Sequence, residues 1–194
     1  MPTTRKPDYL ILVNSEHRLP DNFEETIELV PAENAAGDKY IIEKGTYEAF
    51  LRMREDLIKN EGVQIEMTSV YRNLEEQQAA FDEYLEEFGL EYATKYVAKP
   101  GHSEHHTGFA LDVGFIAEGK FLRLAEELFN AVDLYAILHK NLGRYGFILR
   151  YPESKQPITK INYEPWHIRY IGSAEIAQEI ADKDICFEEY WQKA

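Results

Sequence analysis

The segment SEHHTGFALD, residues 103–112, joins a polar, histidine-rich stretch to an apolar one and decides how the chain can fold. From Gly108 to Phe115 apolar residues alternate around a single carboxylate, Asp112, which predicts a β-strand. The preceding stretch, Tyr96–Thr107, contains a proline and a glycine and predicts an ordered loop. The sequence therefore places a polar loop directly before a mostly apolar strand.

Asp112 lies in the middle of that strand and needs a cation, because an unpaired buried carboxylate is unstable or takes up a proton. A buried salt bridge would satisfy it, and so would a metal. His105 lies seven residues earlier, and the segment EPWH adds Glu164 and His167. Catalytic zinc sites use three ligands from His, Asp and Glu and leave one position for water. The combination favours a zinc centre over a metal-free, hydrogen-bonded polar cluster.

Hydrophobic periodicity predicts the other elements. Helices are expected over Thr46–Lys59, Leu74–Phe88, Phe121–Leu142, Ser173–Ala181 and Phe187–Gln192. Further strands are expected over Gln64–Tyr71, Phe147–Tyr151 and Trp166–Ile171, and the first 40 residues are expected to be mostly extended or looped. Because helices and strands mix without a regular βαβα rhythm, we expect an α+β fold: a single domain with a central, largely antiparallel sheet flanked by helices.

Composition excludes several classes of protein. The formal charge of −14 argues against nucleic-acid binding, which depends on a cationic surface. The single cysteine, Cys186, allows no internal disulfide and is expected to be a small buried hydrophobe. The N-terminal apolar run, Tyr9–Val13, is too short for a signal-peptide core, and no stretch is long enough to span a membrane. We therefore expect a cytoplasmic protein without membrane insertion.

The pattern Ser-x-His-x-x-Gly-x-Ala-x-Asp in residues 103–112, followed about fifty residues later by EPWH, resembles the signature of the LAS metallopeptidases. The resemblance is strongest to VanY- and VanXY-type D-alanyl-D-alanine peptidases, and it extends remotely to Hedgehog domains. It runs from about Leu12 to Gly172, with residues 173–194 as C-terminal helices. It implies that residues 1–194 form one zinc peptidase domain with a Hedgehog/DD-peptidase-like fold.

By residue match, the resemblance implies that His105, Asp112 and His167 bind one Zn²⁺ per chain and that Glu164 is the general base. The alternative for Glu164 is that it orients a histidine ligand. His102 and His106 match no liganding position, so supporting or surface roles are expected for them.

The resemblance also implies a set of residues that contact the substrate: Arg72, Gln77, Ser103, Tyr151 and Trp166. Arg72 ends the stretch SVYR and would act in catalysis on the scissile carbonyl or bind the C-terminal carboxylate. Its alternative is a salt bridge to Glu75 or Glu76. Ser103 could instead be a turn residue, and Trp166 a packing residue.

The function that the resemblance implies is a zinc carboxypeptidase that removes a C-terminal D-amino acid from peptidoglycan-type peptides. It would act as a D,D-carboxypeptidase and also as a D,D-dipeptidase. Its partner would be a small peptide that ends in a D-amino acid, and the resemblance implies no particular oligomeric state. Two alternatives remain: an L,D-carboxypeptidase of tetrapeptides, and a catalytically silent zinc-containing binding module. An acidic interaction domain without metal is a further reading.

Overall fold

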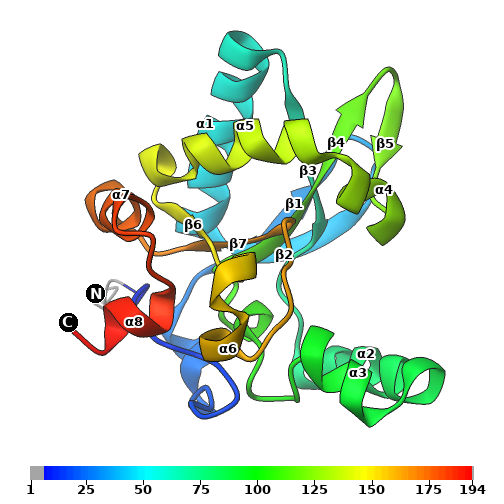
Figure 1. The fold of residues 1–194 in the computed structure, drawn as a ribbon, viewed down its shortest axis with the longest axis vertical. Helices are drawn as coiled ribbons and strands as arrows, with labels where there is room; N and C mark the ends of the chain where they lie inside the picture. Colours follow the sequence, from blue (N-terminus) through cyan, green and yellow to red (C-terminus); the bar gives the residue numbers. More distant parts are fainter. Residues whose placement is uncertain (1–6, 194) are drawn as a thin grey trace.

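The computed structural model describes residues 7–193, which form an α+β domain around one antiparallel sheet (Figure 1). The five strands of this sheet follow the order β3-β4-β7-β6, and β5 pairs with β4. The strands β1 and β2 form a separate hairpin, and every pairing among the described residues is antiparallel. The expected fold class is confirmed.

The strands are β1 (Leu29–Glu33), β2 (Lys39–Glu43), β3 (Gln64–Ser69), β4 (Ala110–Ala117), β5 (Lys120–Leu122), β6 (Phe147–Leu149) and β7 (His167–Tyr170). The α-helices are α1 (Lys44–Glu61), α2 (Leu74–Phe88), α3 (Leu90–Tyr96), α4 (Ala125–Asn130), α5 (Val132–Leu142), α6 (Gln156–Thr159), α7 (Ala174–Asp182) and α8 (Phe187–Trp191). Short 3-10 helices are η1 (Phe23–Thr26), η2 (Glu104–Thr107), η3 (Gly143–Tyr145) and η4 (Glu153–Lys155). None of the described helices combines the length and the hydrophobicity that crossing a bilayer requires.

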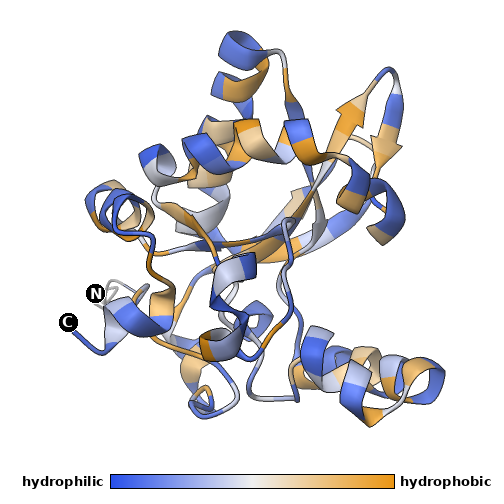
Figure 2. Cartoon of the chain, viewed as in Figure 1, coloured by the Kyte–Doolittle hydropathy of each residue, from blue (hydrophilic) through white to orange (hydrophobic). Residues whose placement is uncertain are grey.

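The two faces of the sheet differ in character because side chains alternate along a strand. Leu111, Val113 and Ile168 belong to the main hydrophobic core, which also contains residues of α1 and α5. Asp112 lies between Leu111 and Val113 on β4, and its register partner His167 precedes Ile168 on β7. The side chains of Asp112 and His167 therefore lie on the opposite face of the sheet. Figure 2 shows apolar residues concentrated along the central strands and on α1 and α5, whereas the projecting end of α1 is hydrophilic.

The start of α2 is fixed by a capping box. The Asn73 side chain accepts a hydrogen bond from the Glu76 amide at 2.9 Å, and the Glu76 carboxylate accepts one from the Asn73 amide at 2.8 Å. Gly89, with a φ of 80°, ends the helix as expected. The cap holds the residue before it, Arg72, at the junction between β3 and α2.

The prediction of one helix over Phe121–Leu142 is wrong. Glu118 and Gly119 both have positive φ, as a tight hairpin turn requires, and the chain returns as β5 along β4. The helical part that follows is divided at Ala131 (φ −84°, ψ 40°) into α4 and α5. The apolar spacing was helical, but strand pairing with β4 overrides it at the N-terminal end. Residues 7–40 are mostly extended or looped, as expected: they contain the strand β1, the first residues of β2 and only the short helix η1.

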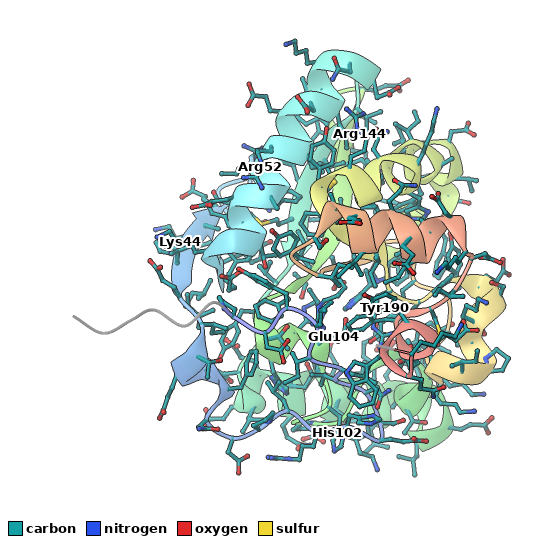
Figure 3. All side chains as sticks on the ribbon, turned by 90° about the vertical axis from the view of Figure 1, so that its left-hand side faces the viewer. Lys44, Arg52, His102, Glu104, Arg144 and Tyr190 are labelled. Carbon is teal, nitrogen blue, oxygen red and sulfur yellow. The ribbon has the colours of Figure 1, made fainter. Side chains whose placement is uncertain are left out.

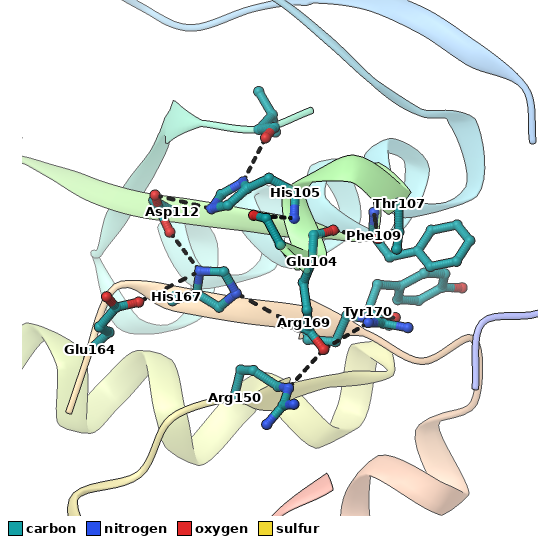
Figure 4. A network of polar contacts seen from close by, with 12 residues as sticks. Glu104, His105, Thr107, Phe109, Asp112, Arg150, Glu164, His167, Arg169 and Tyr170 are labelled. Carbon is teal, nitrogen blue, oxygen red and sulfur yellow. Dashed lines mark hydrogen bonds and ion pairs between the residues drawn. The ribbon is translucent and has the colours of Figure 1, made fainter. Parts of the chain in front are cut away.

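A cluster of buried charges lies on the polar side of the sheet (Figure 4). The Glu104 carboxylate accepts hydrogen bonds from Arg150 Nε at 2.7 Å and Arg169 Nη1 at 2.9 Å. Arg150 also donates two hydrogen bonds, of 2.9 and 2.6 Å, to Glu188 of α8. Burial would raise the pKa of Glu104, but the two guanidinium groups outweigh it and hold that pKa well below its usual range.

We expect Glu104→Gln to lower the free energy of unfolding by roughly 3 kcal/mol, because it leaves two buried guanidinium groups with less compensating charge. Chemical denaturation at pH 7 measures this effect. The contribution of Glu104 is present above its unfolded-state pKa of about 4.3 and is lost as the pH falls below it. The matched control, Glu61→Gln at the exposed end of α1, should change stability by less than about 0.5 kcal/mol. Equal effects of the two substitutions would contradict this role.

Candidate functional site

All the residues predicted to bind metal, act in catalysis or contact substrate line one pocket of about 170 Å³, although they come from six separate segments. They are Arg72, Gln77, Ser103, His105, Asp112, Tyr151, Glu164, Trp166 and His167. Ser69, Tyr84, Tyr96 and Glu104 also border it. The fold thus brings the whole candidate site together.

Strand pairing places the Asp112 carboxylate and the His167 imidazole side by side. Asp112 on β4 and His167 on β7 are direct partners in the antiparallel register, and directly opposed side chains lie on the same face of a sheet. His167 Nδ1 lies 3.0 Å from Asp112 Oδ1. The EPWH segment therefore reaches the site as the start of a strand that pairs with the strand carrying Asp112.

His105 reaches the site from η2, the short helix that the sequence analysis had assigned to the loop. The Ser103 hydroxyl accepts a hydrogen bond from the His105 amide at 3.4 Å and caps this helix. The ring nitrogen Nδ1 of His105 lies 2.6 Å from the carbonyl oxygen of Val70, to which it donates. That contact fixes the tautomer and leaves Nε2, 3.5 Å from Asp112 Oδ2, as the free lone pair.

The three side chains form a suitable metal-binding set. One ligand atom from each of His105, Asp112 and His167 lies within 4.8 Å of the others. In each histidine the ring nitrogen that points away from the other two side chains, here called the outer nitrogen, faces a polar group. In His105 it is Nδ1, which donates to the Val70 carbonyl, and in His167 it is Nε2, which faces Glu104 Oε2 at 3.7 Å. Histidine ligands of zinc are commonly oriented in this way through their second nitrogen. The donor set fits a zinc ion that keeps an open position.

The electrostatics of the site suit a divalent cation. Burial would raise the pKa of Asp112, but His105 and His167 outweigh it and hold that pKa well below its usual range. Burial opposes the charged form of His167, but hydrogen bonds to Asp112 and Glu104 raise its pKa to about 9. Burial and the Arg72 charge lower the pKa of His105 to about 4. The neighbouring carboxylates thus favour positive charge at His167, and a divalent cation bound here would supply that charge in place of a proton.

Glu164 lies beside this set without belonging to it. Its Oε2 is 3.8 Å from His167 Nδ1. Burial raises the pKa of Glu164 to about 8, with the Asp112 charge adding to the shift and His167 opposing it. A carboxyl group that titrates near neutral pH can both accept and donate a proton, which is what general acid–base catalysis requires.

Arg72 and Gln77 have unused hydrogen-bonding capacity at the pocket. Among the described residues, the buried side-chain atoms without a hydrogen-bond partner are Arg72 Nε, Gln77 Oε1, Glu104 Oε2 and His167 Nε2, and all four residues line this pocket. Gln77 donates through Nε2 to the Ala98 carbonyl at 2.7 Å. Within the described part of the chain, no ion pair joins Arg72 to Glu75 or Glu76. Glu104 Oε2 and His167 Nε2 face each other at 3.7 Å, whereas Arg72 Nε and Gln77 Oε1 are left for a polar ligand.

Tyr151 and Trp166 form parts of the pocket wall. The Tyr151 ring packs on His167 with centroids 4.8 Å apart, and Trp166 packs edge-on against Phe129 at 4.9 Å. These contacts hold both rings in place, so the packing interpretation of Trp166 is compatible with its position at the pocket.

Two further histidines near the site, His106 and His139, make hydrogen bonds to backbone groups. His106 accepts from the Gly101 amide at 2.9 Å, and its other nitrogen lies 2.6 Å from the Arg72 carbonyl, so it ties the loop to the residue at the pocket. His139 lies 2.8 Å from the Pro165 carbonyl and so supports the EPWH segment. Neither residue belongs to the metal-binding set, as expected for His106.

Glu104 is a residue of this site that the sequence pattern did not identify. Its carboxylate faces the outer nitrogen of His167 and is itself held by Arg150 and Arg169. The available signal was the presence of two arginines, Arg150 and Arg169, in otherwise apolar strand segments, since arginine is rarely fully buried unless it is paired.

Comparisons with known proteins agree with this geometry. The family model VanY, described as D-alanyl-D-alanine carboxypeptidase, matches residues 39–173. The bifunctional D-Ala-D-Ala dipeptidase and D-Ala-D-Ala carboxypeptidase VanXYC of Enterococcus gallinarum is 36% identical over 185 residues, which cover 93% of this chain and 92% of that protein.

Two solved structures have the same fold. The LdcB LD-carboxypeptidase superposes with a TM-score of 0.81 at 37% identity, covering 98% of this chain and 89% of that one. A variant of the vancomycin-resistance D,D-pentapeptidase VanY in complex with Zn(II) superposes with a TM-score of 0.76 at 31% identity, covering 94% and 98%. Together with the family match, these similarities show that the chain belongs to the VanY family of D-alanyl-D-alanine carboxypeptidases.

Proposed function

We propose that the protein is a zinc-dependent D,D-carboxypeptidase that cleaves the peptide bond before a C-terminal D-alanine, and that it also acts on the dipeptide D-Ala-D-Ala. The observation that carries the proposal is the convergence of His105, Asp112 and His167 beside the separate carboxyl group of Glu164. The relative VanXYC carries both activities in its name, and the VanY structure contains zinc. The cytoplasmic location expected from the sequence stays a prediction.

His105 Nε2, His167 Nδ1 and the Asp112 carboxylate would hold the zinc ion. When bound, zinc lowers the pKa of a coordinated water and polarises a carbonyl group. Glu164 accepts a proton from the attacking water and delivers it to the departing amine, and its raised pKa suits both transfers. Arg72 donates either to the oxygen that becomes negative or to the C-terminal carboxylate of the substrate.

The buried position of the site strengthens these interactions. Charges act more strongly on one another in a pocket from which water is largely removed than at an exposed surface. Gln77 and Ser103 line the same pocket and offer polar groups to the peptide, while Tyr151 and Trp166 supply its apolar walls. We also propose that the described chain forms one peptidase domain that includes α8, because Glu188 of α8 pairs with Arg150.

An L,D-carboxypeptidase is the second candidate, because the LdcB LD-carboxypeptidase is 37% identical to this chain and covers nearly all of it. Both candidates use the same zinc and the same general base. They differ in the configuration of the residue before the scissile bond, and so in the peptide from which D-alanine is released.

The zinc-loaded protein should release D-alanine from D-Ala-D-Ala and from a pentapeptide that ends in D-Ala-D-Ala. A chelator should abolish this release and added zinc should restore it, because the metal activates the water. Amino-acid analysis of the products is the measurement. Release from a tetrapeptide alone would select the L,D-carboxypeptidase, and a zinc-bound protein without activity on any of the three would be a silent binding module.

Replacing His105 by alanine should remove a ligand and lower zinc affinity by more than about 100-fold, since losses of 10–100-fold already follow from changes to the groups that only orient ligands. Elemental analysis after dialysis measures the zinc content per chain. The matched control is His17→Ala, whose ring lies against Trp191 away from the pocket. An unchanged zinc content in His105→Ala would exclude this residue as a ligand.

Glu164→Gln should keep one zinc per chain but lower kcat by about 10²–10⁴-fold, because the amide cannot accept the proton from water. Steady-state hydrolysis of the pentapeptide and a parallel zinc assay separate loss of chemistry from loss of metal. Glu153→Gln, an exposed neighbour on η4, is the control and should behave as the unmodified protein does. Near-normal turnover of Glu164→Gln would refute Glu164 as the general base.

A further inference from the structure

A second cavity, of about 340 Å³, adjoins the catalytic pocket. The two share wall residues, namely Val97, Ala98, Tyr151 and Ile161. The cavity lies where the loop after α3, the loop after α6 and the N-terminal segment around Asn14 meet. The amide of Asn162 donates to the carbonyl of Lys95 at 2.9 Å and joins the first two of these segments.

The lining of this cavity is cationic although the protein is strongly acidic. Lys99, Lys160 and His102 border it, and the described lining residues include no aspartate or glutamate. The whole chain has 35 acidic against 21 basic residues, so a wall with two lysines and no carboxylate departs from the rest of the surface. Such a wall attracts an anion.

The hydrogen-bond donors of this wall are largely free to meet a ligand. Neither Lys99 nor Lys160 forms an ion pair with a carboxylate of the described chain, and Lys160 Nζ donates only to the Pro157 carbonyl. His102 donates through Nδ1 to the Asn14 carbonyl at 2.8 Å, which holds its ring at the cavity wall. Lys160 has a φ of 63°, an uncommon conformation for a residue with a side chain, and it closes α6 there.

The size of the catalytic pocket requires a path for the rest of a longer substrate. At about 170 Å³ it is smaller than the roughly 300–1,000 Å³ of ordinary ligand pockets, so it holds little more than the groups around the scissile bond. The upstream part of a peptide must lie outside it. On the other side, α2 supplies Tyr84 to the pocket and exposes several carboxylates, so that side disfavours an acidic segment; these are Asp82, Glu83, Glu86 and Glu87. The cavity beside Tyr151 is the favourable side.

We infer that the cavity lined by Lys99, Lys160 and His102 binds a carboxylate of the substrate upstream of the scissile bond. The inference rests on the proposed peptidase function and adds a specificity to it: a preference for peptides whose upstream residue has a free carboxylate over peptides in which that group is a carboxamide. Lys99 and Lys160 raise the affinity for that acidic residue and do not contact the scissile bond.

Two pentapeptides test the inference, L-Ala-γ-D-Glu-L-Lys-D-Ala-D-Ala and its counterpart in which the α-carboxylate of the glutamyl residue is a carboxamide. The zinc-loaded protein should prefer the acid by about fivefold or more in kcat/KM, the scale of one or two partly exposed ion pairs. The preference should shrink at high ionic strength, because salt screens such pairs.

In the double variant Lys99→Gln and Lys160→Gln the ratio of kcat/KM between the two peptides should fall to about one. The matched control, Lys59→Gln on α1, should keep the ratio of the unmodified protein. Figure 3 shows labelled His102 at one end of the long axis of the molecule, and α1 extends to the other end. Equal rates on the two peptides in the unmodified protein, or a preference that survives in the double variant, would overturn the inference.

Failure of the proposed function has a different signature, since the protein would then cleave neither pentapeptide nor D-Ala-D-Ala. In that case calorimetric binding of the tripeptide L-Ala-γ-D-Glu-L-Lys and of its carboxamide decides the inference with the same variants. Tighter binding of the acid that depends on the two lysines supports the anion site, and equal binding of both tripeptides overturns it.

Discussion

The pairing register of β4 and β7 is the constraint on which the site depends. A strand places alternate side chains on opposite faces, so the register that sends Leu111 and Ile168 into the core sends Asp112 and His167 to the other face as neighbours. A shift by one residue would bury the charged pair in the core and expose the apolar residues. The free energy that stabilises the core thus also fixes the position of two of the three proposed metal ligands.

The buried charges behind the site form a second layer that makes this arrangement tolerable. Glu104 faces the outer nitrogen of His167, and Arg150 and Arg169 balance its charge. Ion pairs of this kind add little net stability compared with apolar packing, but removing one partner is costly. The layer is therefore better understood as a device that orients His167 than as a source of stability.

Much of the fold and the site could be predicted from the sequence because the informative residues break a pattern. A carboxylate in an apolar strand and two histidine-containing segments identified the candidate set around Asp112, and the structure gathers it in one pocket. The error at Phe121–Leu142 has a different origin. Apolar spacing in that segment fits a helix, and only the partner strand β4 selects an extended start. Glu104 was missed because its partners, Arg150 and Arg169, are distant in sequence and only the fold brings them together.

The attachment of α8 has a consequence for the order in which the protein matures. Arg150 lies between Glu104 and Glu188, and Glu188 also accepts a hydrogen bond from Asn14 at 3.2 Å. The charge layer under His167 therefore joins segments from near both ends of the described chain. During synthesis on the ribosome this layer can close only after residue 188 has emerged, long after His105 and Asp112. Until that moment His167 lacks its fully balanced Glu104 partner, so the orientation of this proposed ligand depends on segments that are synthesised far apart in time.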